Sequence, residues 1–259
     1  MDAIEKNIID LAAWLELPAG RYVLEWEQAL LAKLTVDIFG YNAVQIGMPQ
    51  IDGLAASRMP NRWLTNSVLP TSIAGSIENA TEQRPIVVLH DFSELPFETQ
   101  SIDLIILPHV LEFTTEPHQL LREVERVLIP EGRVIISGFN QASLWGARQF
   151  AGRLNNNYFL PQEGEFISFA RMKDWLKLLS MEVGGHDFGC YVPPCRSEKW
   201  LQRFHFMEGA GQKWWPYLGA VYMVQAVKRV RGMHLIGPAF KQKRLARGNA
   251  VAVVNKAKK

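Results

Sequence analysis

The amino-acid sequence predicts an α/β protein with a Rossmann-like, doubly wound and mainly parallel sheet. Apolar segments of strand length alternate with amphipathic helical segments from residue 85 onward, and this alternation is typical of βαβ units. The composition, with 48% hydrophobic and 21% charged residues, is that of a globular chain and is too apolar for global disorder. A chain of 259 residues is long enough for one domain with appendages.

The N-terminal segment predicts two helices before the sheet begins. Apolar residues recur at helical spacing over residues 4–38, and a Pro-Ala-Gly break interrupts them at residues 18–20. A Gly-Tyr pair at residues 40–41 ends the second helix. We therefore expect residues 1–40 to form a helical preface.

Seven strands and three further helices are predicted in the rest of the chain. Apolar runs place the strands at residues 43–47, 62–69, 85–91, 102–107 and 133–137, from Met181 onward, and at 220–227. Helical periodicity places the helices at residues 118–128, 143–154 and 168–179. The aromatic-rich segment 197–218 is expected to be a local insertion over one end of the sheet, where its rings either line an apolar acceptor pocket or cover the core edge. The main domain then spans residues 41–228, and residues 229–259 form a basic tail.

The sequence carries no signal for export, membrane insertion or disulfide bonding. The N-terminal residues lack the basic stretch and apolar segment of a secretory signal. No apolar run approaches the roughly 18 residues that a membrane span needs. Cys190 and Cys195 are too few for a disulfide framework and lack the spacing of a zinc site. We expect a cytoplasmic protein with free thiols and no membrane span.

The charge distribution divides the chain into an acidic body and a basic end. Residues 228–259 hold ten Lys or Arg and no acid, whereas the rest of the chain holds eighteen basic and twenty-six acidic residues. Clustered positive charge attracts nucleic acid or anionic lipid. We expect residues 228–259 either to bind nucleic acid or to be a solvated terminus.

The candidate binding residues follow the predicted strands. In an open parallel sheet, ligands bind outside the carboxyl ends of the strands. The residues at those ends are 47–50, 91–92, 108–110 and 137–140.

Residues 90–140 carry several motifs that recur together in one protein family. They are an acid at the end of the third strand, an LPF step, an S-x-D-L entry to the fourth strand, the HVLEF turn and the LREVERVLIPEGR helix and turn. This stretch resembles the second half of a class I S-adenosylmethionine (SAM)-dependent methyltransferase of the type 11 family. The SGFN run at residues 137–140 and the helical preface resemble a proteobacterial subgroup with a degenerate glycine-rich loop. The resemblance implies the class I methyltransferase fold, SAM as cofactor and methyl transfer to an unknown acceptor.

The resemblance assigns cofactor roles to three of the strand-end residues. Asp91 would accept a hydrogen bond from the adenine amino group, and the backbone N–H of Phe92 would donate to a ring nitrogen. The alternative for Asp91 is a helix N-cap. His109 would contact the methionine part of the cofactor or border the acceptor, and the alternative is a buried histidine with a structural role. Glu112 shares its helix face at i+3, but Phe113 stands where a further ligand would be needed, so no metal site is expected.

The loop after the first strand departs from the family pattern. Gln45 stands where the family has an acid, and only Gly47 remains of three glycines. Pro49 removes an N–H donor and fixes φ near −65°. The second strand also lacks the acid that binds the ribose hydroxyls. Gln45 and Gly47 remain cofactor candidates, and the preface offers a replacement acid, Glu25 or Glu27, if it folds over the site as a lid.

Ser137 and Asn140, at the end of the fifth strand, are the acceptor-pocket candidates. Asn140 either binds an amide or ring edge of the acceptor or forms an Asx turn before the next helix. No catalytic side chain is identified, so catalysis would depend on proximity and in-line placement.

Three functions are compatible with these residues. The first is a SAM-dependent methyltransferase with a remodelled cofactor loop. The second is a non-catalytic scaffold of the same fold, with nucleic acid bound through the basic tail. The third is a Rossmann-like domain for another nucleoside ligand. Fold alone does not choose among them.

Overall fold

The computed structural model describes residues 11–66, 86–89, 94–155, 158–160 and 165–229. Their centre is a seven-stranded sheet with the strand order β3-β2-β1-β4-β5-β7-β6. The strands are β1 (Asn42–Ile46), β2 (Asn61–Asn66), β3 (Ile86–Leu89), β4 (Ile102–Pro108), β5 (Leu128–Phe139), β6 (Met181–Gly189) and β7 (Val221–Lys228). β1 to β5 pair in parallel, and β7 runs antiparallel to both β5 and β6. The predicted doubly wound, mainly parallel sheet is confirmed.

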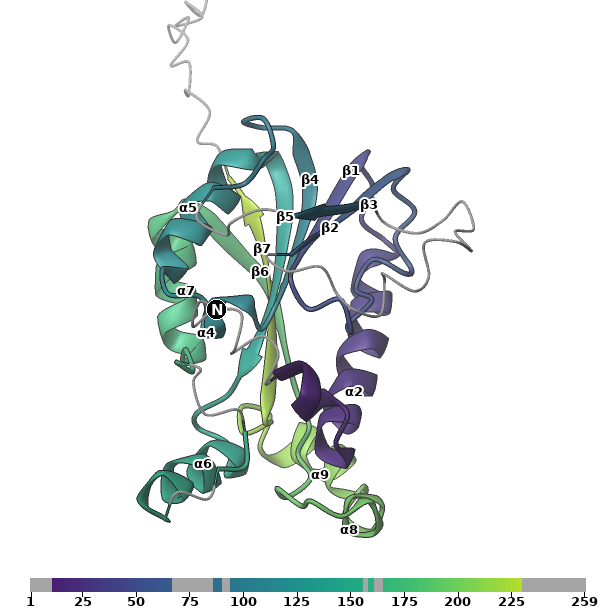
Figure 1. Cartoon of the computed structure of the whole chain (residues 1–259), viewed down its shortest axis with the longest axis vertical. Helices are drawn as coiled ribbons and strands as arrows, with labels where there is room; N and C mark the ends of the chain where they lie inside the picture. Colours follow the sequence, from purple (N-terminus) through teal and green to yellow (C-terminus); the bar gives the residue numbers. More distant parts are fainter. Residues whose placement is uncertain (1–10, 67–85, 90–93, 156–157, 161–164, 230–259) are drawn as a thin grey trace, which may run out of the picture.

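Helices cover both faces of the sheet and one of its ends (Figure 1). They are α2 (Pro18–Thr35), α4 (Val110–Phe113), α5 (Pro117–Val127), α6 (Leu144–Asn155), α7 (Phe169–Leu178), α8 (Glu198–Arg203) and α9 (Met207–Trp214). α5 and α7 lie on one face and α2 on the other, while α6, α8 and α9 lie beyond one end. Because α6 follows β5 and α8 follows β6, that end carries the carboxyl ends of these strands.

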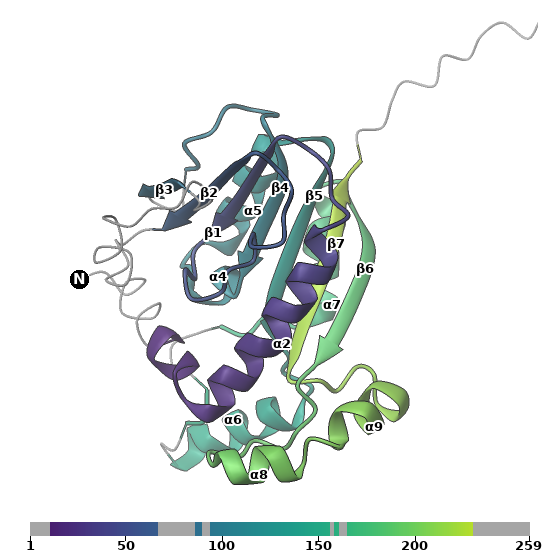
Figure 2. The same cartoon turned by 90° about the vertical axis from the view of Figure 1, so that its right-hand side faces the viewer.

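The two faces of the sheet have separate apolar cores because successive side chains of a strand point to opposite faces. Ala43 and Ile106 belong to the core under α2, whereas Val44 and Ile105 belong to the core under α5 and α7. Helix α2 runs diagonally across its face (Figure 2). A Cβ on Gly189 would lie 2.0 Å from the Trp26 ring, so the absence of a side chain there lets α2 approach the end of β6.

The predicted strands and helices are found close to their expected positions, and the structure adds the short helices α4, α8 and α9. The start of β5 also differs. The turn predicted at residues 130–132 lies inside β5, which begins at Leu128. Glu131 adopts a left-handed conformation (φ 64°), which lets the chain turn without leaving the strand. None of the described helices is long and apolar enough to cross a membrane.

Candidate functional site

A buried cluster of three ionisable side chains lies at the carboxyl end of β4. His109 directly follows the strand in a left-handed conformation (φ 55°) and has no exposed surface. Its Nε2 atom lies 3.0 Å from Oε1 of Glu27 on α2, and its Nδ1 atom lies 2.9 Å from Oε2 of Glu112 on α4. A left-handed residue other than glycine costs free energy and is frequent at functional sites. The cluster therefore joins the N-terminal helix to the strand end where this fold class binds its ligand.

Glu112 also connects this cluster to the next strand. Its Oε1 atom accepts a 2.7 Å hydrogen bond from the backbone N–H of Phe139, the last residue of β5. The Phe139 ring lies against His109, with 4.2 Å between the ring centroids. The ends of β4 and β5 are thus held together by one carboxylate and one ring contact.

The two glutamates determine the charge of His109. Burial lowers the pKa of His109, but the negative charge of Glu27 and the hydrogen bonds to Glu112 and Glu27 outweigh this effect and raise it to about 10. The histidine is therefore protonated at neutral pH. Burial also raises the pKa of Glu112, against the opposing contribution of His109. The cluster combines one imidazolium with two carboxyl groups.

Some polar atoms around the cluster have no partner among the described residues. Glu27 Oε2 and Ser137 Oγ are both buried and accept no hydrogen bond from the described part of the chain. A buried polar atom without a partner is costly, and such atoms are commonly satisfied by a ligand or water. These atoms suit a ligand that donates hydrogen bonds or carries positive charge.

The side chain of Gln45 is fully used within its own loop. Its Nε2 atom donates to the carbonyl oxygens of Gly47, Met48 and Ile51 at 3.2, 3.0 and 2.6 Å, and its Oε1 atom accepts from the N–H of Gly53 at 2.9 Å. Gly47 and Met48 both adopt positive φ values, 69° and 47°. In this arrangement, Gln45 shapes the loop after β1, and ligand contact by its side chain stays a prediction.

Asn140 forms the Asx turn that was one of its two interpretations. Its Oδ1 atom accepts from the N–H of Ala142 at 3.1 Å, and its Nδ2 atom donates to the carbonyl oxygens of Tyr217 and Gly219. Ser137 lies close to the cluster, since its carbonyl oxygen accepts a 3.1 Å hydrogen bond from the N–H of His109. Asp91 and Phe92 lie outside the described residues. Their adenine-binding roles therefore stay predictions.

Two features of this region were not predicted from the sequence. Asn66 ends β2 and is buried, at the place where the family resemblance calls for a ribose-binding acid. No clear signal in the sequence indicated it, because the predicted strand at residues 62–69 extended past Asn66. The second feature is a clamp made by Arg126 on α5, whose signal was the Glu123–Arg126 spacing of i, i+3.

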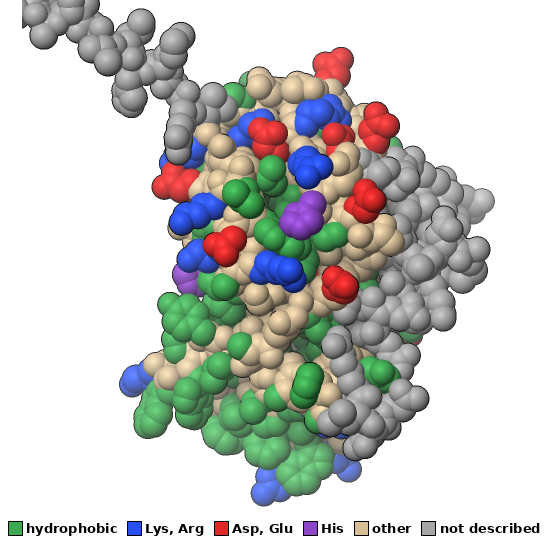
Figure 3. Space-filling model, turned by 90° about the vertical axis from the view of Figure 1, so that its left-hand side faces the viewer, with side chains coloured by type: hydrophobic (Ala, Val, Ile, Leu, Met, Phe, Trp, Pro, Cys, Tyr) green, Lys and Arg blue, Asp and Glu red, His purple; other side chains and the backbone are tan. Residues whose placement is uncertain are grey.

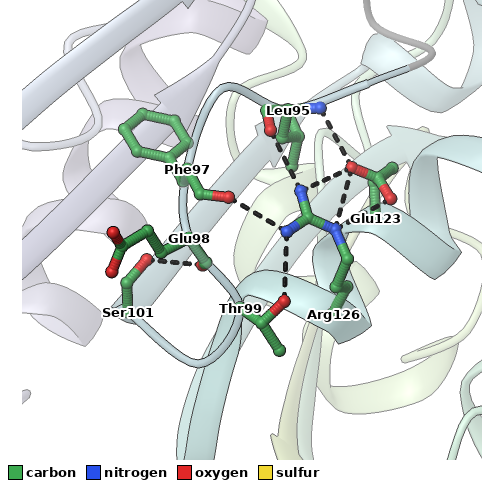
Figure 4. A network of polar contacts seen from close by, with 7 residues as sticks. All are labelled: Leu95, Phe97, Glu98, Thr99, Ser101, Glu123 and Arg126. Atoms are coloured by element: carbon green, nitrogen blue, oxygen red, sulfur yellow. Dashed lines mark hydrogen bonds and ion pairs between the residues drawn. The ribbon is translucent and has the colours of Figure 1, made fainter.

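The Arg126 clamp fixes the segment that follows the predicted adenine site (Figure 4). Arg126 donates to the carbonyl oxygens of Leu95 and Phe97 at 3.0 Å each and to Oγ1 of Thr99 at 3.3 Å. Glu123 binds the same guanidinium and also accepts from the N–H of Leu95. The bonds to Arg126 lower the pKa of Glu123. One guanidinium thus holds the LPF step of the sequence against α5.

Within the described ranges, no group of three His, Cys, Asp or Glu side chains is arranged to hold a metal ion. Cys190 is buried and Cys195 is partly exposed, and neither forms a disulfide.

Comparisons with known proteins match this chain at the level of family and fold. Residues 54–136, from just before β2 into β5, match the methyltransferase domain family. The Escherichia coli K12 protein YafS is 28% identical over 180 residues, which cover 70% of this chain and 69% of YafS. A protein of Methanocaldococcus jannaschii is 25% identical over 118 residues, which cover 45% of this chain and 57% of that protein.

Solved structures share the fold at low sequence identity. One is a complex of the Haloferax volcanii Trm112 methyltransferase activator with a protein assigned as a methyltransferase (TM-score 0.59, 13% identity, covering 87% of this chain and 98% of the other). Another is a SAM-dependent methyltransferase of Thermotoga maritima (TM-score 0.54, 14% identity, covering 80% and 92%). A third is the (4+2)-cyclase SpnF (TM-score 0.54, 14% identity, covering 78% and 80%).

Proposed function

We propose that this chain is a class I, type 11 methyltransferase and transfers a methyl group from SAM to an acceptor molecule. The observation that carries the proposal is the sheet order with β7 inserted antiparallel between β5 and β6, together with the family match over residues 54–136. The buried polar cluster lies at the carboxyl ends of β4 and β5, where ligands of such sheets bind.

The residues of the cluster suit the charged end of SAM. SAM supplies an electrophilic methyl group on a sulfonium and carries an ammonium group nearby. The Oε2 atom of Glu27 has no partner among the described residues, so it can accept a hydrogen bond from a cationic group of the cofactor. In the proposal, Glu27 replaces the acid that the family has at Gln45, and His109 positions Glu27.

The other predicted residues complete the proposed site. Asp91 and Phe92 bind the adenine, and the backbone at Gly47 borders the cofactor, while Gln45 holds the loop. Ser137 and Asn140 border the acceptor, Ser137 through its unpartnered hydroxyl and Asn140 through the turn that it fixes. Catalysis then depends on holding the acceptor in line with the methyl group.

A non-catalytic binding protein is the second candidate function. It is favoured by the loop after β1, in which the Gln45 side chain is saturated by its own backbone and Pro49 lacks an N–H. The fold does not fix the chemistry, since the similar structure of SpnF is that of a cyclase.

Calorimetric titration of the full chain with SAM and with S-adenosylhomocysteine separates the two candidates. Micromolar binding that is lost in Asp91→Ala, but kept in the exposed control Glu98→Ala, would support the methyltransferase. No detectable binding at millimolar ligand would exclude it and favour the second candidate.

We also propose nucleic acid as a partner of the basic tail. Lys228 and Arg229 are already used by the domain, because Lys228 donates to the carbonyl oxygen of Leu128 at 3.0 Å and Arg229 pairs with Glu131 and Glu182. The positive charge that binds nucleic acid must therefore come from residues 230–259. Removal of those residues should weaken binding to nucleic acid at low salt and flatten its salt dependence. Unchanged affinity after truncation would reject this partner.

A further inference from the structure

One end of the molecule exposes a group of large apolar side chains. They lie on α6, α8 and α9, in the link between α8 and α9 and in the turn after α9, beyond the carboxyl ends of β5 and β6. We call them the aromatic end surface, and its members are Leu144, Phe150, Trp200, Phe206, Trp214, Trp215, Tyr217 and Leu218. Figure 3 shows apolar side chains gathered over this end of the molecule. Eight of the twelve exposed large hydrophobic residues in the described part of the chain belong to this surface. They are therefore concentrated in one patch and are not spread singly over the molecule.

The aromatic segment is fixed to the body of the protein. The side chain of Asn140 donates to the carbonyl oxygens of Tyr217 and Gly219, and the Tyr191 hydroxyl donates to the carbonyl oxygen of Pro216. A Cβ on Gly211 would lie 2.3 Å from the Tyr191 ring, so α9 packs directly on that ring. Because these contacts hold the segment in place, the exposure of Trp214 (70%) and Tyr217 (60%) is a property of the fold.

Positive charge accompanies the exposed rings. Lys199, Arg203 and Lys213 are exposed among them, and the Arg203 guanidinium lies 5.3 Å from the centre of the Trp200 ring. Residues 198–229 contain two acids. Glu198 is exposed at the start of α8, and Glu208 is partly buried and accepts a hydrogen bond from the N–H of Tyr191. The three exposed cations outnumber the one exposed acid. In Figure 3, Lys and Arg side chains edge the apolar region and no acidic side chain lies within it.

This combination favours a lipid surface over a second copy of the chain. Trp and Tyr rings are amphipathic and prefer the headgroup region of a bilayer. Lys and Arg near the surface each add about 1 kcal/mol of attraction to anionic lipid. A second copy would bring two sets of like charges together around the apolar centre, which opposes association.

We propose that the aromatic end surface docks this protein on the surface of an anionic lipid bilayer. Trp214, Trp215 and Tyr217 enter the headgroup region, and Lys199, Arg203 and Lys213 contact anionic headgroups. The docking is interfacial, in agreement with the absence of a membrane-spanning helix among the described residues. One consequence rests on the proposed function: the carboxyl ends of β5 and β6, and with them the acceptor side, would face the lipid.

Co-sedimentation of the full chain with vesicles tests the docking without any methyl transfer. We expect binding to vesicles of phosphatidylcholine mixed with phosphatidylglycerol and weaker binding to phosphatidylcholine alone. The double variant Trp214→Ser, Trp215→Ser should bind the anionic vesicles at least about tenfold more weakly, since two large apolar side chains no longer leave water. The control Phe39→Ser, Leu178→Ser removes two apolar residues elsewhere that are more exposed than Trp214 and Trp215, and it should bind like the wild type.

Further measurements keep this test decisive. A chain ending at Arg229 should still bind the anionic vesicles, because the surface and not the basic tail carries the docking. Circular dichroism should be unchanged in both double variants, since all four residues are exposed. The proposal is overturned if the tryptophan variant binds like the wild type, if truncation at Arg229 abolishes binding, or if the full chain binds neither vesicle. It is also overturned if size-exclusion chromatography shows a dimer that the tryptophan variant dissociates, because the surface would then be a protein interface.

Discussion

Glu27 and His109 form an ion pair with no exposed surface on either side chain, 3.0 Å apart, between the N-terminal helix α2 and the end of β4. Glu112 holds the other ring nitrogen of His109 and the backbone of β5. Breaking a buried pair by removing one partner typically costs about 3 to 5 kcal/mol, because it leaves an uncompensated charge. The attachment of α2 therefore depends on the same groups that form the candidate cofactor site.

The stability of the protein should fall as the pH rises from about 6.5 toward 10. The folded state holds the His109 proton up to a pKa of about 10, whereas the unfolded chain loses it near its ordinary value of 6.5. The stabilising contribution is thus fully present below pH 6.5 and is lost as the pH passes through the folded pKa. The free energy of unfolding should decrease by at most about 1.4 kcal/mol per pH unit in this interval.

Urea unfolding of the wild type and of His109→Gln over this pH range measures the effect. The stability difference between the two proteins should be largest at the acidic end and should shrink as the pH rises. Parallel stability curves would show that His109 is not protonated in the folded protein.

Replacement of Glu27 should weaken SAM binding. In Glu27→Gln, the side chain keeps its shape but loses the charge that we propose for the cationic end of the cofactor. We expect the dissociation constant for SAM to rise about tenfold or more, in line with about 1.5 to 3 kcal/mol for a hydrogen bond to a charged group. Glu25→Gln, on the exposed side of α2, is the matched control and should bind like the wild type. Equal affinity in the two variants, with both folded, would remove Glu27 from the cofactor site.

Replacing Gln45 by the acid of the family pattern should destabilise this protein and should not improve its SAM binding. In Gln45→Glu, a carboxylate would face the carbonyl oxygens of Gly47, Met48 and Ile51, to which the amide now donates. Loss of three donated hydrogen bonds and the added repulsion should lower the free energy of unfolding by on the order of 3 kcal/mol. Thermal unfolding checks the stability, and calorimetry checks SAM binding, which should not improve. A stable variant with tighter SAM binding would show that the loop retains the family's mode of cofactor binding.

The sequence predicted the fold well because apolar strands and amphipathic helices are local patterns. The strands at residues 43–47 and 102–107, for example, were found within one residue of each end as β1 and β4. Periodicity does not predict the antiparallel insertion of β7 between β5 and β6, because an apolar run does not encode its neighbours in the sheet. The division of the chain at residues 40 and 228 stays a prediction.

The candidate site was predictable only where its contacts are local. His109 and Glu112 are three residues apart, and their spacing indicated that they share a helix face. The contact of Glu27 with His109 depends on how α2 docks across the sheet, so the sequence offered Glu27 only as one of two acids on a possible lid. Gln45 was a cofactor candidate because it stands where the family pattern has an acid. Its actual partners are backbone carbonyls, which no sequence pattern displays.

The Arg126 clamp should matter for both stability and cofactor binding. Arg126 reaches Leu95, Phe97, Thr99 and Glu123 with one planar guanidinium (Figure 4). A lysine ammonium in Arg126→Lys cannot satisfy these separated acceptors together. Because Arg126 is partly exposed, solvent screening limits the loss, and we expect about 1 to 2 kcal/mol of stability to be lost. Arg122→Lys on the same helix is the control, since Arg122 is exposed and makes none of these bonds in the described structure.

SAM affinity separates a local role of the clamp from a general one. The clamped segment begins four residues after Asp91, so its release should disturb the predicted adenine site. We expect Arg126→Lys to weaken SAM binding by calorimetry at a temperature where the variant is still fully folded, while Arg122→Lys binds normally. If Arg126→Lys loses stability but binds SAM with wild-type affinity, the clamp supports only the fold, and the segment at residues 95–99 does not position the adenine site.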